Sequence, residues 1–176
     1  MVKLLQYQTK YCEGQRKISV AIGMLLAGCI ISSCPSPAFA YTYNNSRFGY
    51  SITVPDKMFK AMPEAYNGDG RVFVSRTDPS VTITVYAGYN VFNRSVREEM
   101  NYRVPDTAEQ LCKKAYDEYF ILEYANSGNA TSIIAILYGG AFYTLIFEAP
   151  IVKLKQYLPT WDSVVSSWKP LKVILE

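Results

Sequence analysis

Apolar and polar residues alternate along several short stretches of the chain, which is the pattern of β-strands that bury one face. Every second residue of the stretch 48–54 is apolar, so this stretch predicts a half-buried strand. Residues 71–76 and 81–85 predict two further strands. The Thr-Asp-Pro-Ser segment at 77–80 is a turn signal, and it joins these two strands into a predicted antiparallel hairpin.

The second half of the chain predicts three more strands, over 121–125, 131–138 and 141–148. The stretch 131–138 is apolar on both faces, which is typical of a strand in the middle of a sheet. The Gly-Gly pair at 139–140 fits a two-residue hairpin loop, and Ser-Gly-Asn at 127–129 marks another turn.

Two helices are predicted from residues that recur at three- and four-residue steps. The first begins at Asp106, which has capping-box spacing to Glu109. Its apolar stripe consists of Ala108, Leu111, Cys112, Ala115, Tyr116 and Tyr119. The second helix begins at Thr160, and its stripe consists of Trp161, Val164, Val165 and Trp168. The polar segment 90–104 is weakly patterned and predicts no regular element.

The order of these elements is strands, helix, strands, helix, and the strands are joined by hairpins. This order predicts the α+β class, with a mainly antiparallel sheet covered by helices. Residues 41–176 have the size of one domain, so we expect a single α+β domain over this range.

The first 40 residues have the three parts of a secretory signal peptide. Arg16-Lys17 form a basic flank, an apolar run extends from Ile18 to Ile31, and Ala38-Phe39-Ala40 has the small-x-small pattern of a cleavage site. The apolar run is shorter than the roughly 20 residues that a membrane-spanning helix needs. We therefore expect residues 1–40 to be a signal peptide and the protein to be exported.

Two processing sites are open within this leader. Cleavage after Ala40 would release a periplasmic or secreted protein. Leu26-Ala27-Gly28-Cys29 resembles the lipobox of bacterial lipoproteins, in which the cysteine becomes the lipidated first residue. Lipidation of Cys29 would anchor the protein to a bacterial membrane, and this anchor is the only membrane contact that the sequence predicts.

The charge of the chain belongs mainly to the leader. The whole chain has a formal net charge of +3, and the first 40 residues contain four basic side chains against Glu13. The remaining body is therefore close to neutral, with its charges interleaved in sign. Nucleic-acid binding requires a concentrated basic surface, so we expect no nucleic-acid partner.

Composition also limits the chemistry that the chain can perform. It contains no histidine, which excludes Ser-His-Asp and Cys-His catalysis by its own residues and removes the commonest transition-metal ligand. Cys112 fits a small buried side chain better than a reactive thiol, and we expect no disulfide. The Asn-Gly-Asp-Gly segment at 67–70 favours a tight turn over a calcium site. We therefore expect no catalytic residue, no cofactor and no metal site.

Carboxylates are the catalytic groups that remain. Glu98-Glu99 and Asp117-Glu118 are sequence neighbours in polar surroundings, which is typical of surface charge. A glycosidase needs two carboxylates about 5–10 Å apart across a cleft, and residues distant in the sequence could still provide them. An envelope hydrolase acting on a cell-wall or glycan substrate is therefore an alternative function. A lipid or small-ligand carrier, with its ligand between sheet and helices, is another.

Four tyrosines lie in or beside loops and the polar middle segment: Tyr66, Tyr86, Tyr89 and Tyr102. A tyrosine offers a large, rigid contact area with a polar tip, which suits the binding of proteins or glycans. The other interpretation is that these rings cover the edges of the sheet and core. We expect these four residues to contribute to a binding surface whose partner is another envelope protein.

A distinctive set of residues opens the body of the chain. It consists of Tyr43–Ile52 (YNNSRFGYSI), Pro55, Asn67–Phe73 (NGDGRVF) and Val81–Tyr86. These residues resemble the start of a group of small bacterial exported proteins and lipoproteins. That group is similar to the PsbP-like α/β/α sandwich superfamily, which includes the DcrB-type envelope lipoproteins. The resemblance covers mainly residues 41–90, and it implies this sandwich fold and an envelope location.

The resemblance implies no catalytic residue, because the small bacterial members of the group have no settled activity. The sequence as a whole therefore predicts an exported cell-envelope protein that acts as a non-enzymatic protein-binding or accessory domain.

Overall fold

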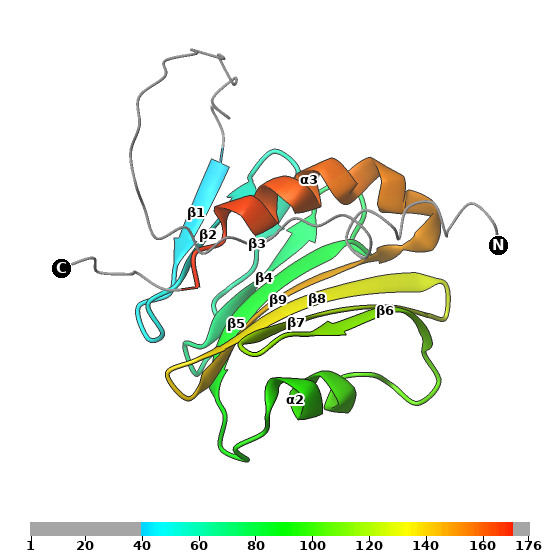
Figure 1. Cartoon of the computed structure of the whole chain (residues 1–176). Coiled ribbons are helices and arrows are strands. Elements are labelled where there is room, and N and C mark those ends of the chain that lie inside the picture. Colours follow the sequence, from blue (N-terminus) through cyan, green and yellow to red (C-terminus); the bar gives the residue numbers. More distant parts are fainter. Residues whose placement is uncertain (1–39, 171–176) are drawn as a thin grey trace, which may run out of the picture. The chain divides into compact units, whose positions relative to one another are not determined.

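The computed structural model describes residues 40–170 (Figure 1). The described residues form a large antiparallel sheet, a separate two-stranded sheet, and helices on both faces of the large sheet. The strand order of the large sheet is β3-β4-β5-β9-β8-β7-β6. Its strands are β3 (Phe59–Ala61), β4 (Gly70–Ser75), β5 (Thr82–Tyr89), β6 (Glu109–Ala115), β7 (Tyr119–Asn126), β8 (Asn129–Tyr138) and β9 (Ala141–Pro150). The two-stranded sheet pairs β1 (Ala40–Asn44) with β2 (Ser51–Pro55).

One face of the large sheet is covered by α3 (Leu154–Ser167), which follows the short 3-10 helix η1 (Ile151–Lys153). Trp161 of α3 is almost fully buried, and its ring stacks on Phe147 of β9 with 5.3 Å between the ring centroids. The β1-β2 hairpin lies on the same side, since Ser167 at the end of α3 donates a hydrogen bond to the carbonyl oxygen of Thr53 over 3.0 Å.

The opposite face packs against the shorter helix α2 (Val96–Tyr102). Val96 and Met100 of this helix are buried against a cluster from β7, β8 and β9 that contains Phe120, Leu122, Ile133, Ala135 and Phe142. Burial of such apolar side chains contributes about 1.5–3 kcal/mol each. The seven-residue helix is therefore held by its packing, because an isolated helix of this length is unstable in water.

The fold class predicted from the sequence is confirmed: the described chain is α+β, with a mainly antiparallel sheet between helices. The predicted hairpin corresponds to β4 and β5, which pair antiparallel. The last two predicted strands correspond to β8 and β9, which pair from Asn129–Pro150 to Tyr138–Ala141 around the Gly-Gly loop.

The predicted helix that begins at Asp106 is wrong, because residues 109–115 form strand β6. This strand lies at the edge of the sheet and pairs antiparallel with β7. Its register shifts between Gln110 and Cys112, and such a bulge interrupts the alternation of period two. The interrupted alternation leaves apolar residues at spacings that imitate a helix.

The two helices that do form differ from the predicted ones. The polar segment 90–104 contains α2, whose start is capped by Ser95 and Glu98. The last helix begins at Leu154, six residues before the predicted start at Thr160, and it contains Pro159. A proline lacks the backbone N–H that a helix interior uses, so proline usually lies outside a helix or in its first turn. For this reason Pro159 favoured a helix start just after it.

Cys112 is buried in β6 and is disulfide-bonded, so the expectation that the chain has no disulfide is wrong. The other cysteine of this bond lies outside the described residues. The leader predicted over 1–40, including the lipidation candidate Cys29, also lies outside them, apart from Ala40, which is the first residue of β1.

Candidate binding site

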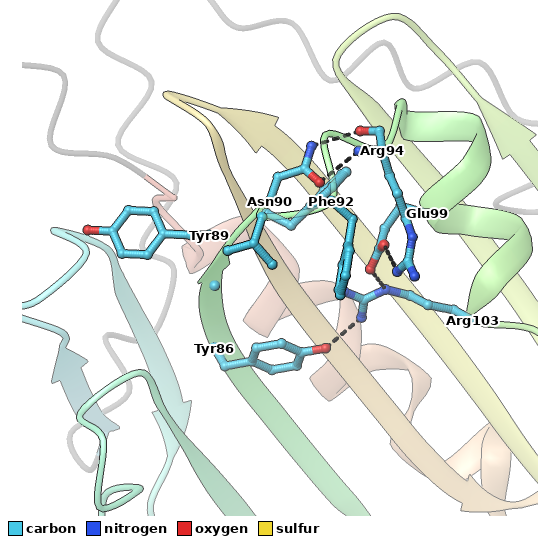
Figure 2. Close-up of a pocket in the computed structure, with 10 residues that line it drawn as sticks. Tyr86, Tyr89, Asn90, Phe92, Arg94, Glu99 and Arg103 are labelled. Atoms are coloured by element: carbon cyan, nitrogen blue, oxygen red, sulfur yellow. Dashed lines mark hydrogen bonds and ion pairs between the residues drawn. The ribbon is translucent and has the colours of Figure 1, made fainter.

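A pocket of about 190 Å³ lies where the end of β5 meets α2 (Figure 2). Its walls come from β5, from the connection between β5 and α2, from α2 itself and from the start of β9. Successive residues of a strand face opposite sides of a sheet. Val85 of β5 is therefore buried on the α3 side, whereas Tyr86 points to the α2 side and lines the pocket.

The connection between β5 and α2 is held in place by Asn90. Its side-chain oxygen accepts a hydrogen bond from the backbone nitrogen of Arg94 over 2.9 Å, and its side-chain nitrogen donates to the carbonyl oxygen of Arg94 over 2.8 Å. The backbone nitrogen of Asn90 donates to Gly140 in the β8-β9 loop over 2.8 Å. Asn93 has a φ of 51°, a left-handed conformation that asparagine tolerates better than most residues. The connection is thus a defined loop.

The start of α2 is fixed by a capping box. The hydroxyl oxygen of Ser95 accepts a hydrogen bond from the backbone nitrogen of Glu98 over 3.3 Å, and the Glu98 carboxylate accepts from the backbone nitrogen of Ser95 over 2.7 Å. These bonds satisfy donors that a helix start leaves unpaired. The Ser95 hydroxyl also donates to the Glu98 carboxylate over 2.7 Å. This bond and the one from the Ser95 backbone nitrogen lower the pKa of the Glu98 carboxyl, because both favour its charged form.

Three charged side chains converge at the pocket. Glu99 is buried, and both of its carboxylate oxygens accept hydrogen bonds from arginines: Oε2 from Arg94 over 3.1 Å and Oε1 from Arg103 over 2.8 Å. Arg103 also donates to the hydroxyl oxygen of Tyr86 over 2.6 Å. The hydrogen bond that Arg94 donates to Glu99 raises the pKa of the Arg94 guanidinium. Figure 2 shows these four side chains turned toward one another between β5 and α2.

The Arg94 guanidinium also lies against two aromatic rings. Its central carbon is 3.7 Å from the ring centroid of Tyr102 and 4.9 Å from that of Phe92. An arginine over a ring face gains about 0.5–1 kcal/mol at exposed sites and more when desolvated. The two rings and Glu99 therefore hold the planar group in one orientation.

Large apolar side chains surround the pocket and remain exposed to solvent. Val91 and Phe92 at the tip of the loop are 73% and 75% exposed, and Tyr89 and Tyr102 are 63% and 69% exposed. The Tyr89 ring points away from the charged groups, toward Phe48, with 5.3 Å between the ring centroids. A concentration of exposed apolar side chains beside polar groups marks a site of interaction.

The structure brings three of the four tyrosines predicted as binding residues to this region. Tyr86 and Tyr89 line the pocket, and the ring of Tyr102 lies against Arg94, which also lines it. Tyr66 is fully exposed in the connection between β3 and β4 and does not line the pocket. A binding role for each of the four stays a prediction.

Sequence reasoning did not identify four other residues of the region, Val91, Phe92, Arg94 and Arg103, and it considered Glu99 only as a surface or catalytic carboxylate. One signal for them was present. Ser95 and Glu98 have capping-box spacing, and a helix begun there places Glu99 and Arg103 four residues apart on one face.

The adjacent carboxylates considered for catalysis do not act as pairs in the structure. Glu98 caps the helix, whereas Glu99 binds the two arginines. Glu99 is the one carboxylate that lines the pocket, so this pocket lacks the pair that a glycosidase uses. Asp117 and Glu118 are exposed in the turn between β6 and β7.

Within residues 40–170, no group of three or more Cys, Asp or Glu side chains could hold a metal ion. In the predicted turn at 67–70, the Asp69 carboxylate accepts a hydrogen bond from Asn67 over 2.6 Å, and its carbonyl oxygen accepts one from Tyr50 over 2.8 Å. None of the helices among the described residues has the length and apolar character needed to span a membrane.

Cyanobacterial and yeast proteins are among the solved structures that share this fold. Cyanobacterial PsbP (CyanoP) from Synechocystis sp. PCC 6803 has a TM-score of 0.58 and 18% sequence identity, and the match covers 82% of this chain and 98% of that one. The Saccharomyces cerevisiae Ran-binding protein Mog1p has a TM-score of 0.55 and 12% identity, and the match covers 75% of this chain and 95% of that one. No family model and no curated protein matches the chain. The comparisons confirm the PsbP-like fold that the sequence resemblance implied.

Proposed function

We propose that this protein is a non-enzymatic binding domain of the bacterial cell envelope that docks another envelope protein. The docking surface consists of the pocket and the exposed residues around it, Tyr89, Val91, Phe92 and Tyr102. The observation that carries the proposal is their combination. Val91 and Phe92 are exposed on a loop that hydrogen bonds hold in one conformation, and the exposed Tyr89 and Tyr102 belong to β5 and α2 on either side of it.

The form of this surface favours a protein partner. Protein interfaces are enriched in tyrosine, phenylalanine and arginine, and energetically important contacts cluster around such anchors. Tyr89, Phe92, Arg94 and Tyr102 supply these residue types within one region. The related fold of Mog1p, which is described as a Ran-binding protein, is consistent with a binding role for this architecture.

The two alternative functions receive less support at this site. A carboxylate-pair hydrolase would need a second acid beside Glu99 in the pocket. A carrier of a lipid or small ligand would need a larger, mainly apolar cavity, because such sites usually occupy about 300–1,000 Å³.

Photocrosslinking in intact cells tests the docking surface. We would place benzoylphenylalanine at Val91 and, as a matched control, at Val152, an exposed valine of η1 that lies outside the pocket. We expect a specific protein adduct from position 91 and none of the same mass from position 152. The double change Tyr89→Ala with Tyr102→Ala should abolish the adduct, whereas Tyr116→Ala should leave it unchanged. An adduct of equal yield in the double variant would refute the proposal.

The envelope location is tested separately by cell fractionation and by mass spectrometry of the mature N-terminus. We expect processing either after Ala40 or at Cys29, with the second form in the membrane fraction. Recovery of the uncleaved chain among cytosolic proteins would refute this part of the proposal.

A further inference from the structure

We propose that the pocket receives a carboxylate side chain, aspartate or glutamate, from an acidic segment of the partner in which apolar residues flank the acid. This inference rests on the proposed docking function and specifies the chemistry of the partner.

The charge of the pocket is the first argument. Its lining contains two cations, Arg94 and Arg103, and one anion, Glu99. The lining therefore has a net charge of +1, and Glu98, which interacts with Arg94, caps the helix and does not line the pocket. Arg94 keeps 26% of its side chain exposed and Arg103 keeps 14%, so both remain within reach of an incoming group. A protein carboxylate is the anion that complements such a site most simply.

The geometry of the guanidinium groups is the second argument. A guanidinium carries five N–H donors. Arg94 uses Nη1 for Glu99, and Arg103 uses Nε for Glu99 and Nη1 for Tyr86, so donors remain on both side chains. Stacking on Tyr102 orients the planar group of Arg94 before any ligand arrives. Because less side-chain freedom is then lost on binding, such an arginine is suited to two-point recognition of a carboxylate.

The size of the pocket and its surroundings give the third argument. A volume of about 190 Å³ corresponds to roughly six water molecules in the liquid. This space is large enough for one side chain of a partner. Val91 and Phe92 form an exposed apolar rim beside it. An acid that enters the pocket would therefore carry neighbours that cover this rim, which predicts apolar residues next to the acid in the partner segment.

Selection from a random heptapeptide display library tests the inference on the full chain. The wild-type protein should enrich peptides with an aspartate or glutamate beside aromatic or aliphatic residues. Arg94→Glu should lose this enrichment and favour lysine or arginine instead. The matched control is Arg97→Glu, which makes the same charge change at an exposed position of α2 that does not line the pocket. It should retain the wild-type preference.

A synthesised enriched peptide gives the quantitative test. Replacement of its acid by the corresponding amide should weaken binding at least about tenfold, as expected for loss of charge-assisted hydrogen bonds. Arg94→Gln removes the positive charge without placing a second negative charge beside Glu99. It should weaken binding of the acidic peptide by a similar factor. Arg94→Gln also serves if Arg94→Glu fails to fold, as judged by circular dichroism.

The outcomes separate this inference from the proposed function. Enrichment of apolar peptides without acids would overturn the carboxylate inference and leave the docking surface standing. Absence of any enrichment would also overturn the carboxylate inference. The crosslinking experiment at Val91 would still test the docking function independently. Equal loss of acidic peptides in Arg94→Glu and Arg97→Glu would overturn it as well, because a general charge effect would then explain the preference.

Discussion

Removal of the negative charge at Glu99 should destabilise the protein far more than the same change at its neighbour Glu98. Glu99 is 9% exposed and accepts hydrogen bonds from two arginines, whereas Glu98 is exposed and caps the helix. Replacing each by glutamine keeps the shape and removes the charge. The two variants therefore form a matched pair on one helix.

The magnitude for Glu99→Gln follows from its two contacts. A hydrogen bond between charged groups contributes about 1.5–3 kcal/mol, and a neutral one about 0.5–1.5 kcal/mol. Glutamine keeps one acceptor oxygen, so one charge-assisted bond is weakened and the other is lost. Two half-buried arginines also remain without their counter-charge. We expect a loss of about 2–3 kcal/mol in the free energy of unfolding. Glu98→Gln should change it much less, because glutamine can also close a capping box.

Urea and thermal unfolding followed by circular dichroism would measure both variants. For a chain of this length, 1 kcal/mol corresponds to about 2–4 °C in Tm, so Glu99→Gln should lower Tm by roughly 5–10 °C. A double-mutant cycle of Glu99→Gln with Arg103→Gln should show that their effects on the free energy of unfolding are not additive, since the two side chains are in contact over 2.8 Å. Equal stabilities of the Glu99 and Glu98 variants would refute the reasoning, because the ion-pair network would then not hold α2.

Three further predictions concern other parts of the fold. Gly70→Ala should destabilise the protein strongly in urea unfolding, because its Cβ would collide with the backbone oxygen of Val85; an unchanged midpoint would contradict this close approach. Lys153 and Ser80 lower the pKa of Asp78 from 3.8 to about 2, so stability present above pH 4 should be lost as the pH falls toward 2. Asp78→Asn should flatten this part of the stability–pH curve, and an unaltered curve would exclude Asp78 as its cause. Cys112 should be alkylated in denaturant only after reduction. Alkylation without reduction would indicate a mature chain that lacks the earlier cysteines, as cleavage after residue 40 would produce.

The strands that the sequence predicted correctly are those whose pattern is determined by burial of the strand itself. β5 alternates between buried Ile83, Val85 and Ala87 and more exposed neighbours, because one of its faces is covered by the rest of the protein. β8 and β9 meet at a Gly-Gly loop whose glycines have φ values of 56° and 74°, which other residues rarely adopt. In these cases the local residue pattern is sufficient to predict the strand.

β6 could not be predicted in the same way, because its conformation depends on pairing with β7. The bulge near Cys112 breaks the alternation, and the Asp106–Glu109 spacing imitates a helix start. The true capping box, Ser95 with Glu98, opens a helix of only seven residues, whose apolar positions are too few to show a period.

The candidate site was predictable in its aromatic part and not in its charged part. Exposed tyrosines beside loops could be recognised from the sequence, as Tyr89 and Tyr102 show. The meeting of Arg103 with Tyr86 could not, because these residues are 17 positions apart and come together only through the packing of α2 against the sheet. Knowledge of α2 would have revealed the Glu99–Arg103 pair, since it spans one helical turn.

The order of the β5-α2 loop connects the fold to the proposed function. Val91 and Phe92 expose large apolar surfaces to water. Burying these side chains would have stabilised the protein, so their exposure is unfavourable for folding. Asn90 nevertheless fixes the loop at both ends, and Arg94 is held between Glu99 and the aromatic rings. The same contacts that attach α2 to the sheet therefore also hold the exposed side chains in place. A partner that binds them would find the loop already ordered, so its binding would need little further loss of conformational entropy.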